Sequence, residues 1–309
     1  MKFSLDLATN RVAAGAEFAS FEGISEIARA AENAGYGAAF VTDHPFPVQR
    51  WLEGGGHHAL DPFVALSFAA AATSRLRVQT NILVLPYRNP FLVAKAALTL
   101  DLLSQGRLTL GVAVGYLRGE FHALGADFEA RNETADEVLL AMKRAWTEDD
   151  VHFKGRTFEA RGNTMRPRPV QQPHPPLWVG GNSRRAIRRA IEHGDGWIPF
   201  PNTPAMAPHT RTAVLESLDD LARRIALARE DAAAAGRTRP LEIAFSLDAH
   251  TGDGLAAQAA CDRVHRLADL GVTWLTVGFP AATRAEYLVK LERFARDVIE
   301  PCRSALPAA

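Results

Sequence analysis

Cysteine, charge of one sign and long hydrophobic runs are all scarce in this chain of 309 residues. The two cysteines, Cys261 and Cys302, form no CxxC or zinc-type spacing and suggest a reducing compartment. Lysine plus arginine equals aspartate plus glutamate at 35 each, and no basic run is long enough to follow a nucleic acid. The longest uncharged apolar stretch, residues 62–73, is too short to span a bilayer.

These absences favour a cytoplasmic protein whose partner is a small molecule, with no nucleic acid and no membrane. No signal peptide is visible, because Asp6 interrupts the only early apolar run. No GxGxxG motif follows a strand, which argues against a Rossmann dinucleotide site. Adjacent His57 and His58 diverge and have no carboxylate at ligand spacing, so we expect no metal site and interpret their loop as solvated or substrate-facing.

One joint recurs along the sequence: the end of a helical segment, a glycine, and then a short apolar strand. It occurs at Gly35, Gly106, Gly194 and Gly271. The segments between these joints have helical periodicity, which is typical of repeated βα units and a parallel sheet. Eight strands alternating with helices predict a (β/α)8 barrel. Periodicity alone leaves a doubly wound open sheet as the alternative.

The length is normal for one such barrel, so we expect a single domain over residues 1–309. Residues 147–175 interrupt the pattern. Two short β-type runs there flank residues 154–156 like a hairpin, and the rest is rich in proline, arginine and glutamine. We interpret this stretch as an insertion before the fifth strand and not as a second core.

A tight turn follows the apolar run at residues 177–179. Gly180 and Gly181 precede Asn182 and Ser183, either of which could cap the helix that follows. A helix start carries unpaired N–H groups and suits a phosphate, and a bound polyanion would offset the four arginines between positions 184 and 189. A capped surface helix with solvated arginines is the alternative, and the residues alone leave both open.

In a barrel of this kind, the active site lies at the carboxyl ends of the strands. That rule selects Asn10, Asp43, His44, Asn81, Tyr116, the turn at residues 180–183, Asp248 and His250. His44 suits general acid or base work, because the unperturbed pKa of histidine is about 6.5.

Three neighbours of His44 are candidates for contact with the substrate. Asp43 would either face the substrate or brace the loop, and Phe46 and Trp51 could flank a flat ring. Farther along, the run from Gly111 to Gly115 leaves room for something close to the strand backbone, although close helix packing would explain it equally well.

Four segments together resemble the bacterial luciferase-like oxidoreductase superfamily: Thr42-Asp43-His44, Asn81-Ile82-Leu83, residues 106–116 and residues 179–183. The similarity spans about residues 1–300, and residues 106–116 are its most specific part. Among the branches, the chain is most similar to enzymes that use coenzyme F420, a deazaflavin.

The resemblance implies a (β/α)8 barrel with a flavin-like cofactor across its C-terminal mouth. The residues that would contact the cofactor are Asn81, Ile82, Val114, Gly115, Tyr116, Gly180, Gly181, Asn182 and Ser183. The first two would form a bulge under the ring, in the family often through a non-proline cis peptide. The last four would hold the phosphate. His44 matches the histidine that lies beside the reactive ring and acts as acid or base.

The expected activity is hydride transfer between F420 and a small organic substrate. An FMN-dependent two-component monooxygenase of the luciferase or alkanesulfonate type is the alternative, since both cofactors share a tricyclic ring, a ribityl chain and a phosphate. F420 adds a lactyl-oligoglutamate tail, for which Arg118, Arg184 or Arg185 are suited. From a different class, a non-catalytic flavin-binding protein remains open, with a metal-dependent hydrolase as a distant third.

One position departs from the sugar-phosphate dehydrogenase branch of the superfamily. That branch has a proton-donating glutamate where this chain has Tyr116, whose phenol has an ordinary pKa of about 10. A sugar phosphate is therefore not expected as substrate, and the second proton-transfer group is left unassigned. Members of the superfamily are frequently dimers, so a homodimer is a further expectation.

Overall fold

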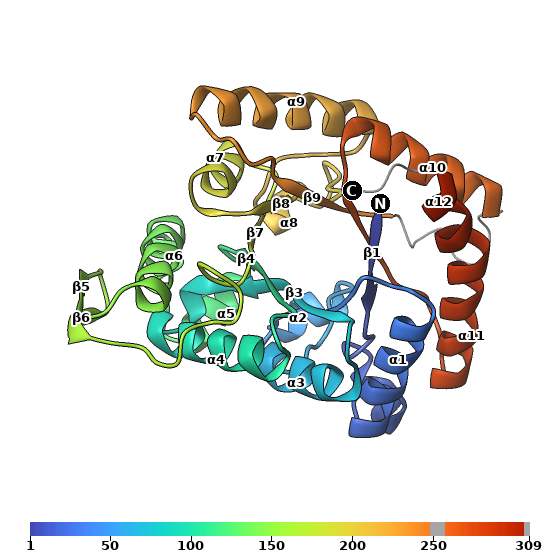
Figure 1. The fold of residues 1–309 in the computed structure, drawn as a ribbon, viewed down its shortest axis with the longest axis horizontal. Helices are drawn as coiled ribbons and strands as arrows, with labels where there is room; N and C mark the ends of the chain where they lie inside the picture. The colour runs from blue at the N-terminus through green and yellow to red at the C-terminus, as the bar shows by residue number, and fades with distance from the viewer. Residues whose placement is uncertain (248–256, 306–309) are drawn as a thin grey trace.

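The computed structural model describes residues 1–247 and 257–305. Within them, eight parallel strands close into a barrel with helices around it, so the predicted (β/α)8 fold is confirmed and the open sheet is excluded (Figure 1). In chain order the barrel strands are β1 (Lys2–Asp6), β2 (Ala38–Val41), β3 (Arg77–Val84), β4 (Leu108–Ala113), β7 (Leu177–Gly180), β8 (Gly196–Ile198), β9 (Glu242–Ser246) and β10 (Trp274–Val277).

The helices that surround the barrel are α1 (Phe21–Asn33), α3 (Pro62–Ala72), α4 (Pro90–Leu103), α6 (Arg131–Thr147), α7 (Arg184–His193), α9 (Leu218–Ala234), α10 (Ala257–Leu270) and α11 (Arg284–Phe294). Short helices lie in the loops: η1 (Val12–Glu17), α2 (Gln49–Glu53), η2 (Leu85–Tyr87), α5 (Arg118–Ala123) and α8 (Ala207–Thr210). After α11 the chain continues through η4 (Ala295–Ile299) into α12 (Glu300–Ala305).

Local side-chain caps explain where several helices begin. Asp61 Oδ1 accepts hydrogen bonds from the N–H groups of Phe63 and Val64, and Asn89 Oδ1 accepts one from Phe91. In each case proline occupies the first helical position, where no N–H is needed. The Asp61-Pro62 and Asn89-Pro90 pairs predict these two helix starts from the sequence alone, and the structure confirms both.

The sequence pattern predicts a helix over residues 212–235, a loop after the fourth strand and a last helix over residues 284–298, and the structure differs at each. The first helix begins only at α9, because Ser217 and Asp220 form a capping box. The segment after β4 contains α5, and the last helix continues beyond residue 298 into α12. The hairpin expected in residues 147–175 is present as β5 (Val151–Lys154) and β6 (Glu159–Asn163), beside α6 (Figure 1).

The interior of the barrel is filled by side chains and is not a pore. An inner cluster contains Ala38, Trp178, Ile198, Ala244 and Trp274. The two indole rings meet edge to face with centroids 5.4 Å apart. Since these rings fill the barrel interior, the carboxyl ends of the strands are the part left for a site.

Among the described residues, no helix is both long enough and apolar enough to cross a membrane.

Candidate active site

His44 follows β2 and lies among aromatic rings contributed by other loops. Its ring centroid is 4.5 Å from that of Trp51 on α2, 4.9 Å from that of His57 and 6.2 Å from that of Tyr116. The structure therefore brings together two predicted site residues, His44 and Trp51, and places Tyr116 nearby. Phe46, also predicted to face the substrate, is 68% exposed.

A buried carboxylate holds the His44 ring. Glu120 on α5 is fully buried, and its Oε2 atom lies 3.2 Å from His44 Nδ1. The same oxygen accepts a hydrogen bond of 2.9 Å from the Tyr87 hydroxyl, while Oε1 accepts one of 3.1 Å from the Phe46 N–H. A carboxylate beside Nδ1 favours the tautomer protonated at that nitrogen, which leaves Nε2 as the proton acceptor.

The sequence pattern places Glu120 in the segment after the fourth strand and does not select it as a site residue. The available signal was its place beside Phe121, a fully buried residue of α5. A glutamate on the covered face of a short helix is seldom buried unless it has a partner. Its partner, however, lies 76 positions away along the chain.

Two ring-bearing neighbours of His44, His57 and Tyr116, are uncharged near neutral pH. Burial, reinforced by the charge of His44, lowers the pKa of His57 to about 4, and its Nε2 atom lies 3.2 Å from Thr42 Oγ1. Burial, with Glu120 adding to it, raises the pKa of Tyr116 to about 12. Both side chains can therefore contact the surroundings of His44 and offer hydrogen bonds without adding charge.

Asp43 is buried and occupied by protein partners. Arg88 binds both carboxylate oxygens, at 2.7 Å and 2.8 Å, and the Val84 N–H donates to Oδ2 at 2.9 Å. Of the two roles considered for this residue, the contacts correspond to bracing the His44 loop. Direct contact with a substrate would require the Arg88 pair to open.

The bulge expected in strand three is present. The Asn81–Ile82 peptide is cis, and the register of β3 against β4 shifts between Thr80 and Leu83. Glycines make room for it: a Cβ on Gly180 would lie 2.2 Å from Ile82 Cδ1, and one on Gly111 would lie 2.2 Å from the Thr80 carbonyl oxygen. The close approach at Gly111 is thus to the backbone of β3 and not to a helix.

In the turn after β7, some hydrogen-bonding groups already have protein partners and others are left for a ligand. Ser183 is the N-cap of α7, with its hydroxyl accepting from the Ala186 N–H at 3.1 Å. The side chain of Asn182 is fully buried and donates to the carbonyls of Phe200 and Ala213. Its amide therefore fixes neighbouring loops, and the N–H groups of Gly181 and Asn182, predicted to hold a phosphate, donate to Ile198 O and Thr212 Oγ1. At the start of α7, the N–H groups that precede that of Ala186 have no intrahelical acceptor and are suited to a phosphate.

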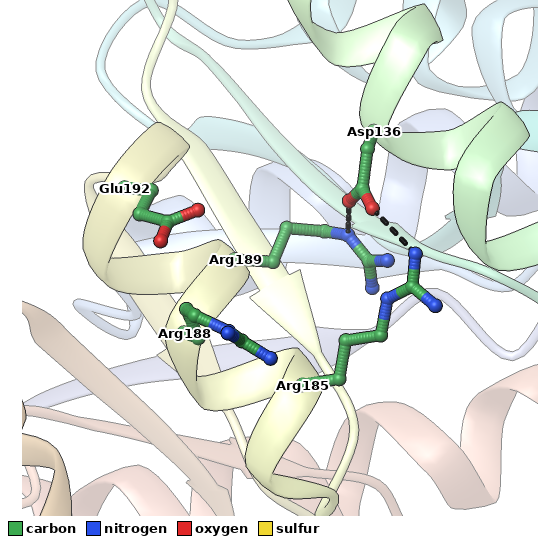
Figure 2. Close-up of a pocket in the computed structure, with 5 residues that line it drawn as sticks. All are labelled: Asp136, Arg185, Arg188, Arg189 and Glu192. Atoms are coloured by element: carbon green, nitrogen blue, oxygen red, sulfur yellow. Dashed lines mark hydrogen bonds and ion pairs between the residues drawn. The ribbon is translucent and has the colours of Figure 1, made fainter.

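The arginines near the start of α7 are directed at the neighbouring helix. Arg185 binds Glu133 of α6 at 2.7 Å. Arg185 also binds Asp136 of α6 at 2.9 Å, and Arg189 binds the same carboxylate (Figure 2). Asp136, Arg185 and Arg189 line a pocket of about 280 Å³ between the helices, together with Arg188 and Glu192. Protein carboxylates, and not a bound polyanion, thus offset charges at Arg185 and Arg189, which corrects that part of the sequence interpretation.

A second ionisable group lies at the end of β1. Asp6 lies two residues after Ser4 on β1, so both side chains point to the same face of the strand. The Ser4 hydroxyl donates a hydrogen bond to Gln79 across the barrel interior. Asp6 Oδ1 accepts a hydrogen bond of 2.9 Å from the Ala8 N–H, and a Cβ on the facing Gly278 would lie 3.5 Å from Oδ2. Burial raises the pKa of Asp6 to about 6. Sequence reasoning did not select this carboxyl group as a candidate.

The remaining strand-end candidates contribute less. The buried Oδ1 atom of Asn10 has no hydrogen-bond partner among the described residues. Asp248 and His250 lie outside the described residues. In the part of the chain that the structure describes, no three histidine, cysteine, aspartate or glutamate side chains are grouped to hold a metal ion.

Comparisons with known proteins give a consistent family assignment. A family model described as luciferase-like monooxygenase matches residues 1–273. An uncharacterised protein of Mycobacterium tuberculosis (strain ATCC 25618 / H37Rv) is 32% identical over 297 residues, covering 88% of this chain and 93% of that protein. The FMNH(2)-dependent dimethylsulfone monooxygenase of Pseudomonas putida is 33% identical over 182 residues, covering 58% of this chain and 48% of that enzyme.

Among solved structures, an F420-dependent secondary alcohol dehydrogenase in complex with an F420-acetone adduct matches with a TM-score of 0.70. The match covers 96% of this chain and 98% of that chain at 16% sequence identity, so the likeness is one of fold.

Proposed function

Since this chain belongs to the luciferase-like monooxygenase family, we propose that it transfers a hydride between coenzyme F420 and a small organic substrate. The observation that carries this proposal is the His44 imidazole, held by the buried Glu120 at the mouth of the barrel. Hydride transfer to or from a carbon–oxygen bond needs a proton moved at the oxygen, and an imidazole oriented in this way can move it.

The residues present fit a flavin-like cofactor. The bulge at Asn81–Ile82 would support the ring, and Val114, Gly115 and Tyr116 would line its tail. At the turn from Gly180 to Ser183, the phosphate would be bound through the N–H group of Ser183 and those at the start of α7, because the Gly181 and Asn182 N–H groups donate to Ile198 and Thr212. When bound, the deazaflavin would supply the hydride chemistry.

The side chains around that position would manage protons and orientation. His44 Nε2 would take the proton from a substrate hydroxyl, or return it to a carbonyl oxygen, while Glu120 stabilises the positive imidazolium that forms. Asp6, whose pKa is about 6, would be the second proton-transfer group that the sequence left unassigned. Trp51 would pack against the substrate or the ring.

Parallel titration of the purified protein with F420 and FMN, followed by fluorescence quenching, tests the cofactor. His44→Ala then tests the chemistry: the Kd for the cofactor should stay within about threefold, while turnover over a panel of alcohols and ketones falls by roughly 10²–10⁴. His122, which is exposed on the same helix as Glu120, provides the matched control as His122→Ala. Full turnover in His44→Ala would refute the assignment.

An FMN-dependent monooxygenase is the second candidate, favoured by the identity to the Pseudomonas putida dimethylsulfone monooxygenase. Tight binding of reduced FMN with negligible binding of F420 would select it. Tight cofactor binding without turnover on either panel would instead support a flavin-binding protein that lacks catalysis.

We propose a homodimer as well, formed through the outer faces of α3 and α4. These neighbouring helices expose Val64, Phe68, Leu92 and Leu103, with exposed fractions from 42% to 73%. An exposed apolar face of this kind favours a protein contact. Light scattering after size-exclusion chromatography should give a dimer for the native chain and a monomer for Phe68→Glu combined with Leu92→Glu.

A further inference from the structure

Three arginines from separate segments surround one aromatic ring. Phe128 is buried, and its ring centroid lies 4.5 Å from the guanidinium carbon of Arg118, 4.0 Å from that of Arg131 and 4.9 Å from that of Arg211. Arg118 begins α5, Arg131 begins α6, and Arg211 follows α8. We call this group the arginine cluster.

Protein groups offset only part of the charge in the arginine cluster. Arg118 pairs with Glu129, which is 70% exposed on its side chain. Within residues 1–247 and 257–305, neither Arg131 nor Arg211 forms an ion pair with a carboxylate, and the buried Nε atom of Arg131 has no hydrogen-bond partner. Interaction with the ring face stabilises each cation only modestly, by about 0.5–1 kcal/mol at exposed sites.

The electrostatics of Arg131 reflect this arrangement. Its pKa is lowered, first by burial and then by the positive charge of Arg211. Like charges held around one ring repel one another, so a polyanion placed between them would bind favourably. The arginines of α7 behave differently, because Arg185 and Arg189 are paired with Asp136.

The arginine cluster connects to both halves of the proposed site through short chains of contacts. On one side, the ring of Phe128 contacts that of Phe121 at 5.1 Å, and Phe121 contacts Tyr87 at 4.8 Å, whose hydroxyl binds Glu120. On the other side, Arg211 immediately precedes Thr212, whose hydroxyl accepts a hydrogen bond from the Asn182 N–H in the turn after β7.

Resting on the proposed function, we propose that the arginine cluster binds the carboxylates of the glutamyl tail of F420. The start of α7 provides for the phosphate, so these guanidinium groups are free for a second anionic group farther along the same molecule. FMN has no such group beyond its phosphate. The cluster therefore distinguishes between the two cofactors that the phosphate turn cannot separate.

The test compares the Kd values of three probes: F420 with its glutamyl tail, F420 lacking all glutamates, and FMN. The native protein should bind tailed F420 about tenfold more tightly than the tail-free form, with the difference shrinking at high salt. Arg211→Asn removes one charge and suits the left-handed backbone there, where φ is 51°. It should weaken tailed F420 about five- to tenfold and leave tail-free F420 unchanged.

Arg118→Gln is a second variant with the same expectation, and Arg211→Lys should retain much of the affinity. Arg188→Asn on α7 is the control. It also removes one exposed arginine, but this residue lies in the pocket between α6 and α7 in Figure 2 and not in the arginine cluster. Equal affinity of the native protein for the two F420 forms, or an equal loss of both in Arg211→Asn, would overturn the tail site while leaving the proposed function intact. Binding of no flavin or deazaflavin would overturn both.

Discussion

Replacing Asp6 with asparagine should make the protein more stable at neutral pH and abolish part of the pH dependence of its stability. Burial raises the pKa of this carboxyl group from 3.8 to about 6, so the folded state holds its proton more tightly than the unfolded chain. The contribution of the protonated Asp6 carboxyl group to the free energy of unfolding is therefore complete below about pH 4 and is lost as the pH rises through about 6. Asparagine stays neutral throughout and can still accept from the Ala8 N–H.

The difference between the two pKa values corresponds to about 3 kcal/mol, because each unit is worth about 1.4 kcal/mol. Relative to the native chain, Asp6→Asn should gain up to about that amount at pH 7.5 and much less at about pH 4.5. That figure already includes the hydrogen bond from the Ala8 N–H and the attraction of Arg11, both of which lower the pKa of Asp6.

Urea unfolding followed by circular dichroism at both pH values measures the effect. Asp269→Asn, at an exposed position in the last turn of α10, is the control and should change the free energy of unfolding by less than about 0.5 kcal/mol at either pH. A gain for Asp6→Asn that is the same at both pH values would refute the reasoning, since only the ionised carboxylate is disfavoured by burial.

Two further predictions concern Glu120, the carboxylate that contacts His44, and Gly111, the glycine that faces the bulge in β3. Glu120→Gln should lower turnover by about 10–100-fold while the Kd for the cofactor changes less than threefold, because His44 loses its charged partner; His122→Gln is the control in the same kinetic assay. Gly111→Ala should destabilise the fold by about 1–3 kcal/mol or more in urea unfolding, since its Cβ would meet the Thr80 carbonyl oxygen at 2.2 Å; native-like stability would contradict that contact.

Much of the barrel was predictable because its signals are local. The glycine joints, apolar strands and caps such as Asp61 and Asn89 each act within a few residues, so one segment of sequence contains the whole pattern. The resemblance added what periodicity cannot supply, namely the bulge at Asn81–Ile82, which the structure contains. The short helix α5 escaped prediction because its stability depends on burial of Phe121 and not on its own periodicity.

The sequence by itself determined that His44 ends a strand and that the Gly180–Ser183 turn opens a helix. Only the tertiary structure decided which groups surround them. Glu120 reaches His44, and Arg185 turns to the carboxylates of α6, through contacts between segments far apart in the chain. Such contacts depend on how whole elements pack, and burial of this kind also sets the pKa of Asp6, so no local pattern encodes them.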